Sequence, residues 1–144
     1  MATILLQFPL VSWSGKTQKL LLDVKDSKIS HITLPSFPIG PEEFELAAKF
    51  CYGMHVEITL SNVTMVRCAA HILEMTEEFA EKNLENRAEV YLKDIVLPNI
   101  SNSISILHQC ESLLPVSEEI NLVNRLINAT ANNACKEQLT SLVY

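Results

Sequence analysis

The residues best spaced for chemistry are Cys68, His71 and Glu74, which follow one another at intervals of three. Side chains three apart share one face of a helix, and zinc accepts a thiolate together with an imidazole. A zinc site needs three or four converging ligands, however. Cys68 belongs to an apolar helical stripe, and His71 is predicted to point outward. We therefore predict no metal site, and keep as an alternative a thiol- or zinc-dependent enzyme that requires Cys68 and His71.

The other candidate nucleophiles do not indicate catalysis either. His108 and Cys110 are two residues apart, so on a helix they point to different sides. The three glycines are isolated, which leaves no phosphate-binding loop, and no Gly-x-Ser-x-Gly elbow occurs. Acidic pairs lie near predicted helix starts, where carboxylates complement the helix dipole. We predict that the protein is not an enzyme, with no catalytic residue and no cofactor.

Composition and charge predict a globular chain that works through protein surfaces. The 144 residues are 48% hydrophobic and 19% charged, which suffices for a buried core. A net charge of −6 argues against nucleic-acid binding, which needs clustered Lys and Arg. No apolar run is long enough to span a membrane, and no secretory signal is evident. The four scattered cysteines are typical of free thiols in a reducing compartment, so we expect an intracellular, cytoplasmic protein.

Helices are predicted to position most of these side chains. The clearest one covers 41–52, where Pro41 and two acids open the helix and Gly53 can adopt the left-handed conformation that closes it. Ser61 is the expected N-cap of the next helix. The other predicted segments are helices at 9–22, 62–75, 80–97 (with Ile95 facing inward), from 101 or 103 to 110, and 117–128, strands at 29–34 and 54–59, and a fraying tail after 130. The pattern indicates an α+β fold dominated by helices.

The chain also carries a series of sequence blocks in a characteristic order over about residues 8–130. These blocks are Phe8-Pro9-Leu10-Val11-Ser12, Ser14-Gly15-Lys16, Phe44 to Gly53, Asn62-Val63, Arg67-Cys68-Ala69-Ala70, Leu73 to Glu77, Cys110 to Pro115, and Glu118-Glu119. Together they closely resemble the BTB/POZ domain of the plant non-phototropic-hypocotyl and root-phototropism proteins. The resemblance implies a BTB/POZ-like small sheet capped by helices over 1–97, followed by a helical hairpin extension, or linker, over 98–144.

The start of the chain departs from that family. Family members carry further strands before the position of Phe8, and these end in a His-Lys pair, whereas residues 1–7 stand there in this chain. We expect an amino-terminally shortened domain whose sheet edges lack the partners that the missing strands supply. The family's large carboxy-terminal domain is also expected to be absent.

Because no chemistry is indicated, surfaces are the expected functional part. The resemblance implies that the helix at 9–22 lies at a dimer interface, and aromatic residues are enriched at the centres of such interfaces. Many BTB domains bind cullin-3 through an apolar-x-Glu motif, for which this chain offers only Val24-Lys25-Asp26, and residues near Tyr52 to Val56 are the other considered contact. The predicted interface residues are Leu10, Trp13, Tyr52, Met54 and Val56.

The resemblance implies a substrate adaptor of a cullin-3 ubiquitin ligase in plant phototropic and auxin-linked signalling. Its expected partners are a second copy in a homodimer, the cullin-3 scaffold, and a photoreceptor kinase bound through regions outside this chain. The alternative is a structural self-association scaffold, peripheral at the plasma membrane, that takes no part in ubiquitin transfer.

Overall fold

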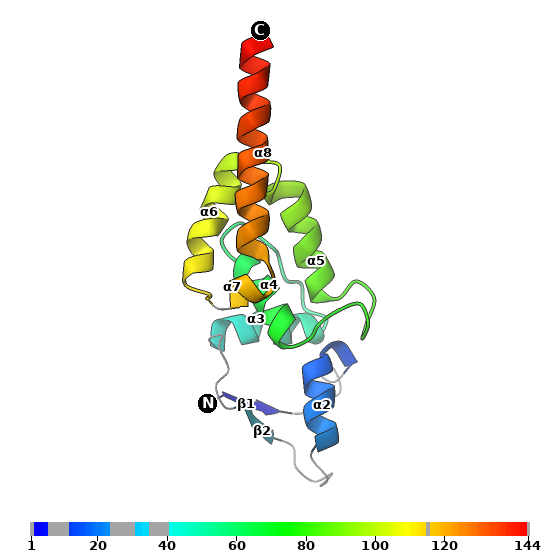
Figure 1. Cartoon of the computed structure of the whole chain (residues 1–144). Helices are drawn as coiled ribbons and strands as arrows, with labels where there is room; N and C mark the ends of the chain where they lie inside the picture. Colours follow the sequence, from blue (N-terminus) through cyan, green and yellow to red (C-terminus); the bar gives the residue numbers. More distant parts are fainter. Residues whose placement is uncertain (1, 6–11, 24–30, 35–40, 115, 144) are drawn as a thin grey trace.

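Helices build the body of the molecule (Figure 1), in a computed structural model that describes residues 2–5, 12–23, 31–34, 41–114 and 116–143. In chain order the helices are α2 (Gly15–Asp23), α3 (Pro41–Cys51), α4 (Val63–Ile72), α5 (Leu84–Tyr91), the π-helical turn η1 (Leu92–Val96), α6 (Ile100–Glu111), α7 (Val116–Glu119) and α8 (Leu122–Val143). The strands are β1 (Ala2–Leu5) and β2 (His31–Leu34).

The two strands form an antiparallel ribbon in which Ala2 lies opposite Leu34 and Leu5 opposite His31. β2 falls within the predicted strand at 29–34, whereas β1 was not predicted as a strand. The predicted strand at 54–59 is wrong, because these residues run without a strand partner between α3 and α4. Alternating side chains are not sufficient for a strand, which also needs a neighbour to hydrogen-bond with.

The predicted α+β fold, with a small sheet capped by helices, is also wrong. Every described residue of the buried apolar core comes from a helix or from a connection beside one. The described strands form only the two-stranded ribbon, and Figure 1 shows it with α2 below the other helices. Two strands alone bury too little surface to be stable by themselves. The fold therefore depends on the packing of helices.

α4 is the centre of that packing. It contacts α3, α5, α6 and α7, and its Val63, Cys68, Ala69 and Ala70 are fully buried. The small alanine side chains let neighbouring helices approach closely. α4 is therefore buried on most of its sides. The rest of the core consists mainly of Phe50, Val56, Met75, Leu84, Leu92, Val96, Ile106, Leu122 and Leu126.

Asparagine side chains cap the first turns of two helices, α5 and α6. Asn83 accepts a hydrogen bond from the Leu84 N–H, so α5 begins at Leu84 rather than at residue 80. Asn99 caps α6 by accepting a hydrogen bond from the Asn102 N–H at 2.9 Å. The predicted N-cap at Ser61 is wrong: Asn62 stands at the N-cap position of α4, and its amide accepts from the Thr59 N–H at 2.8 Å without capping the helix.

The carboxy-terminal helix is longer than predicted. The helix expected at 117–128 divides at Asn121, whose φ of 59° breaks the chain direction between α7 and α8. α8 then continues to Val143, beyond the predicted end at residue 128, and the predicted fraying of the tail stays a prediction. No Gly or Pro follows Asn121, and nothing local ends the helix. Its first half packs on α6, and Figure 1 shows its far half extending beyond the other helices. The division into 1–97 and 98–144 stays a prediction.

Candidate protein-binding surface

The end of α3 presents two large apolar side chains to solvent. Gly53 adopts φ 75°, as predicted for the residue that closes this helix, and its N–H donates to the Phe50 carbonyl. The chain turns there, and the Met54 N–H donates back to the Lys49 carbonyl. On either side of this turn Tyr52 is 47% exposed and Met54 is 56% exposed.

A groove of about 570 Å³ begins at the residue after Met54. Its one wall is the extended segment 55–58, and its other wall is formed by α5 and η1. On that second wall Val90 is 50% exposed and Ile95 is 45% exposed. We call Tyr52, Met54, Val90 and Ile95, with the groove beside them, the α3–α5 surface.

η1 determines which side chains reach the groove. The expectation that Ile95 faces inward is wrong, because the π-helical turn adds a residue to the local repeat and Val96 takes the buried position instead. The Leu97 N–H donates to the Leu92 carbonyl at 2.8 Å, the five-residue spacing of a π-helix. Such turns occur frequently at functional sites.

Charged side chains line both walls of the groove. Glu57 lies on the 55–58 wall, while Lys82 precedes α5, Arg87 lies within it and Asp94 lies in η1. Arg87 donates to the Val56 carbonyl at 3.4 Å, and its guanidinium carbon is 5.5 Å from the centre of the Phe50 ring. This contact fixes the segment 55–58 against α5, because it joins the two walls.

Of the five predicted interface residues, two lie on the surface and two are buried or partly buried in the described structure. Tyr52 and Met54 lie on the surface. Val56 is only 3% exposed, so its side chain lies in the core beneath the groove. Trp13 is partly buried and meets the Phe50 ring edge-on, with the ring centres 5.1 Å apart. Leu10 lies outside the described residues.

A charge network holds α5 in place behind the surface. Glu89 accepts hydrogen bonds from Arg67 Nε at 2.7 Å and from both terminal nitrogens of Arg125 at 2.9 and 2.8 Å. Arg67 also donates to Glu85 at 3.1 Å. Burial raises the pKa of Glu89, but the hydrogen bonds and charges of Arg125 and Arg67 outweigh it and hold that pKa below its ordinary value. α4, α5 and α8 are thereby tied together through one carboxylate.

The residues considered for chemistry do not converge. Burial raises the pKa of the Cys68 thiol to about 12, which keeps it protonated and unreactive. His71 is exposed and pairs with Glu119 at 3.4 Å. Within the part of the chain that the structure describes, no three His, Cys, Asp or Glu side chains gather where they could hold a metal ion. None of the described helices is both long and apolar enough to cross a membrane.

Plant proteins match the chain over nearly all of its length. A BTB/POZ domain-containing protein of Arabidopsis thaliana is 61% identical over 94% of this chain and 21% of its own length. The BTB/POZ domain-containing protein SETH6 from the same plant is 60% identical over the same shares. Root phototropism protein 2, also from Arabidopsis thaliana, is 41% identical over 92% of this chain and 22% of its own. Over nearly all of its own length the chain is thus similar to plant BTB/POZ domain-containing proteins.

The predicted BTB/POZ resemblance is therefore confirmed, and it supports the prediction of a protein-interaction module. The chain spans about a fifth of the length of these relatives. No family model matches it, and no solved structure does. Because BTB/POZ domains act by binding proteins, the α3–α5 surface is the candidate functional site.

Proposed function

We propose that the chain is the adaptor module of a cullin-3 ubiquitin ligase in plant phototropic and auxin-linked signalling, and that cullin-3 docks on the α3–α5 surface. The observation that carries the proposal is a groove lined by the exposed apolar side chains of Val90 and Ile95, with exposed Tyr52 and Met54 just before its 55–58 wall in the chain. Apolar surface gathered in this way marks binding sites on soluble proteins. Tyr52 fits the role of an aromatic anchor, a residue type common among binding hot spots.

The charges of the groove support a specific partner rather than a general apolar contact. The lining holds two basic side chains, Lys82 and Arg87, and two acidic ones, Glu57 and Asp94, so a partner with complementary charges docks in a preferred orientation. The Glu89 network and the Arg87 contact hold both walls of the groove in place before binding. A preformed surface loses less conformational entropy when the partner binds.

Recruitment is the proposed mechanism. The module positions the ligase scaffold, substrate and photoreceptor kinase bind through regions outside this chain, and ubiquitin transfer is carried out by partners. The buried thiols have no part in it, because their raised pKa values leave them protonated.

The second candidate function is a self-association scaffold at the plasma membrane. Its specific support is the β1–β2 ribbon, since each of its two strands has one edge without a partner among the described strands. Free strand edges pair readily with another chain. A homodimer formed through these strand edges needs no cullin.

The two functions are distinguished by binding an amino-terminal fragment of cullin-3 to the purified chain in a calorimeter. We expect a complex with a dissociation constant of about 10 μM or tighter, and about tenfold weaker binding by Met54→Asp and by Val90→Asp. Ile127→Asp is the matched control, because Ile127 is 50% exposed on α8 and does not line the groove. If no complex forms at protein concentrations of tens of micromolar and light scattering shows a stable dimer, the result favours the self-association scaffold over the cullin-3 adaptor.

A further inference from the structure

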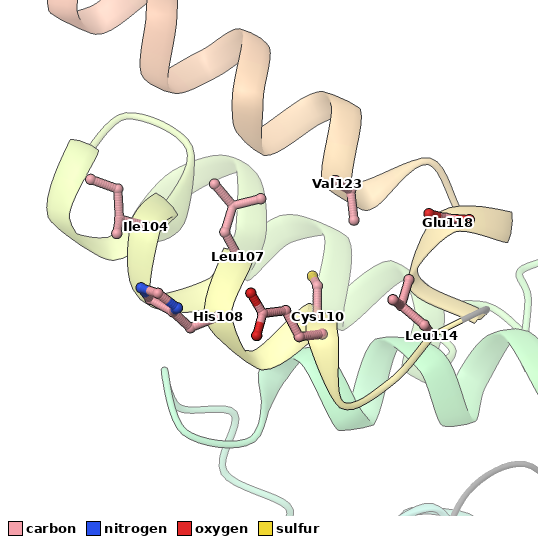
Figure 2. Close-up of a pocket in the computed structure, with 8 residues that line it drawn as sticks. Ile104, Leu107, His108, Cys110, Leu114, Glu118 and Val123 are labelled. Atoms are coloured by element: carbon pink, nitrogen blue, oxygen red, sulfur yellow. The ribbon is translucent and has the colours of Figure 1, made fainter.

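A second apolar groove, of about 400 Å³, lies between α6 and the beginning of α8 (Figure 2). On α6, Ile104, Leu107 and Glu111 are spaced by three and four residues, so they share one helix face. Leu114, which follows α6, and Val123 of α8 complete the apolar lining. A cavity of about 150 Å³ already accepts a benzene ring, so this groove has room for more than one aliphatic side chain.

The groove is preformed by the packing beneath it. Ile106, Leu122 and Leu126 are fully buried where α6 meets α8. Ser117 donates to the Cys110 carbonyl at 2.9 Å and fixes α7 against the end of α6. Above this rigid base Ile104 remains 43% exposed and Leu114 remains 52% exposed.

The rim of the groove is negatively charged. Glu111 and Glu118 line it and are exposed, and neither takes part in an ion pair with another described residue. The adjacent Glu119, in contrast, pairs with His71. His108 is the single basic side chain in the lining, which contains no Lys or Arg. An apolar groove with two free carboxylates at its rim is complementary to apolar side chains flanked by positive charge.

We propose that this groove binds a basic amphipathic helix of a protein partner, whose aliphatic side chains enter between α6 and α8 while its Lys or Arg side chains meet Glu111 and Glu118. Two helices form the walls, and a groove of this kind accepts a helix through residues spaced by three and four. The site lies on other elements than the α3–α5 surface, so it does not depend on cullin-3 binding.

A second copy of the chain is a weaker fit to the groove. Its basic helix with adjacent leucines is α2, which carries Lys16 and Lys19. In the folded chain the Gly15 and Lys16 N–H groups donate to the carbonyls of Glu74 and Leu73, and Lys19 pairs with Glu74. α2 is therefore already committed within its own molecule, and a separate protein is the expected source of the helix.

The test uses the whole chain labelled with nitrogen-15 and three synthetic helical peptides of about 16 residues. The first carries Leu at positions i, i+3, i+4 and i+7 with flanking Lys, the second replaces Lys by Glu, and the third replaces Leu by Ser. We expect the Leu/Lys peptide to shift the amide signals of Leu107, Leu114 and Val123, and the other two to bind about tenfold more weakly.

Variants of the chain then test the two parts of the recognition. The double variant Glu111→Lys/Glu118→Lys is expected to prefer the Leu/Glu peptide, whereas Glu77→Lys/Glu78→Lys, the same charge change at exposed positions elsewhere, keeps the original preference. The variant Leu114→Asp is expected not to bind the Leu/Lys peptide. Thermal unfolding monitors the fold, and if Leu114→Asp unfolds, the charge-reversal pair decides alone.

Three results would overturn the proposal. The first is equal binding of the Leu/Lys and Leu/Glu peptides, and the second is an unchanged preference in Glu111→Lys/Glu118→Lys. The third is a dimer without peptide that Leu114→Asp dissociates, since this assigns the groove to a second copy.

Discussion

Replacing Glu89 by Gln should weaken the whole helical body, because one carboxylate joins three helices. Gln has nearly the same shape, but it lacks the charge and one of the two acceptor oxygens. Arg67, whose side chain is 9% exposed, would then keep only Glu85 as a charged partner. Arg125 would lose its two-pronged contact with Glu89.

The magnitude follows from the burial of the three side chains. Removing one partner from a fully buried pair costs about 3–5 kcal/mol, and a charged hydrogen bond is worth about 1.5–3 kcal/mol. Glu89 and Arg125 are 30% and 31% exposed, so solvent screens part of the interaction. We expect Glu89→Gln to lower the free energy of unfolding by about 2–3 kcal/mol. The melting temperature should fall by about 5–10 °C.

The same carboxylate gives the stability a defined pH dependence. Because its pKa is lowered in the folded chain, the unfolded chain takes up the proton first as the pH falls. The stabilisation from Glu89 is therefore complete above its ordinary pKa of 4.5, and it is lost as the pH falls toward the lowered folded value. Glu89→Gln should unfold with a weaker dependence on pH in this acidic range.

Urea unfolding followed by circular dichroism at several pH values measures both effects. Glu77→Gln is the matched control, since Glu77 is exposed and in no described ion pair, and it should change stability by less than about 0.5 kcal/mol. If Glu89→Gln is equally mild, the network behaves as an ordinary surface ion pair and the reasoning is refuted.

Further predictions concern packing and thiol reactivity. Gly15→Ala should destabilise the fold by about 1–3 kcal/mol, because the added methyl group would lie 2.3 Å from the Phe79 ring; an unchanged melting temperature would contradict the close packing. Asn83→Ala should cost about 2–3 kcal/mol in urea unfolding, since the fully buried amide caps α5 and also bonds to the Trp13 carbonyl; a loss near zero would argue against these bonds. Burial raises the pKa of three thiols to about 11 or 12 and protects them from reagents: Cys51, Cys68 and Cys110. A thiol reagent at pH 8 should therefore label only the exposed Cys135 in the native protein. Rapid labelling of a second thiol would contradict this protection.

Elements whose limits are encoded locally could be predicted from the sequence. α3 opens at Pro41 and is closed by Gly53 as expected, because both residues act through their own backbone preferences. The start of α5 could not be found in this way. Asn83 caps that helix while it also bonds to Trp13, 70 positions earlier in the chain, and such a contact exists only in the folded molecule.

The candidate surface was accessible to sequence reasoning only in part. Tyr52 and Met54 follow from the end of α3, whereas Val90 was missed because an aliphatic residue within a helix is usually taken as core. The position of Ile95 depends on the π-helical turn, which shifts the repeat by one residue without a sequence signal that we recognise. The segment 54–59 has the alternation of a strand, but strand formation depends on a partner that local pattern does not reveal.

The far half of α8 extends beyond the other helices, so its tip moves further than its base when the helix tilts. Arg125 is bonded to Glu89 near the base of this helix, and Val143 lies about 27 Å further along at the usual rise per residue. A tilt of about 5° at the base therefore swings the tip by about 2 Å over this length. A small tilt that α5 passes to α8 through the Glu89–Arg125 bonds would thus move the Val143 end of α8 more than its base.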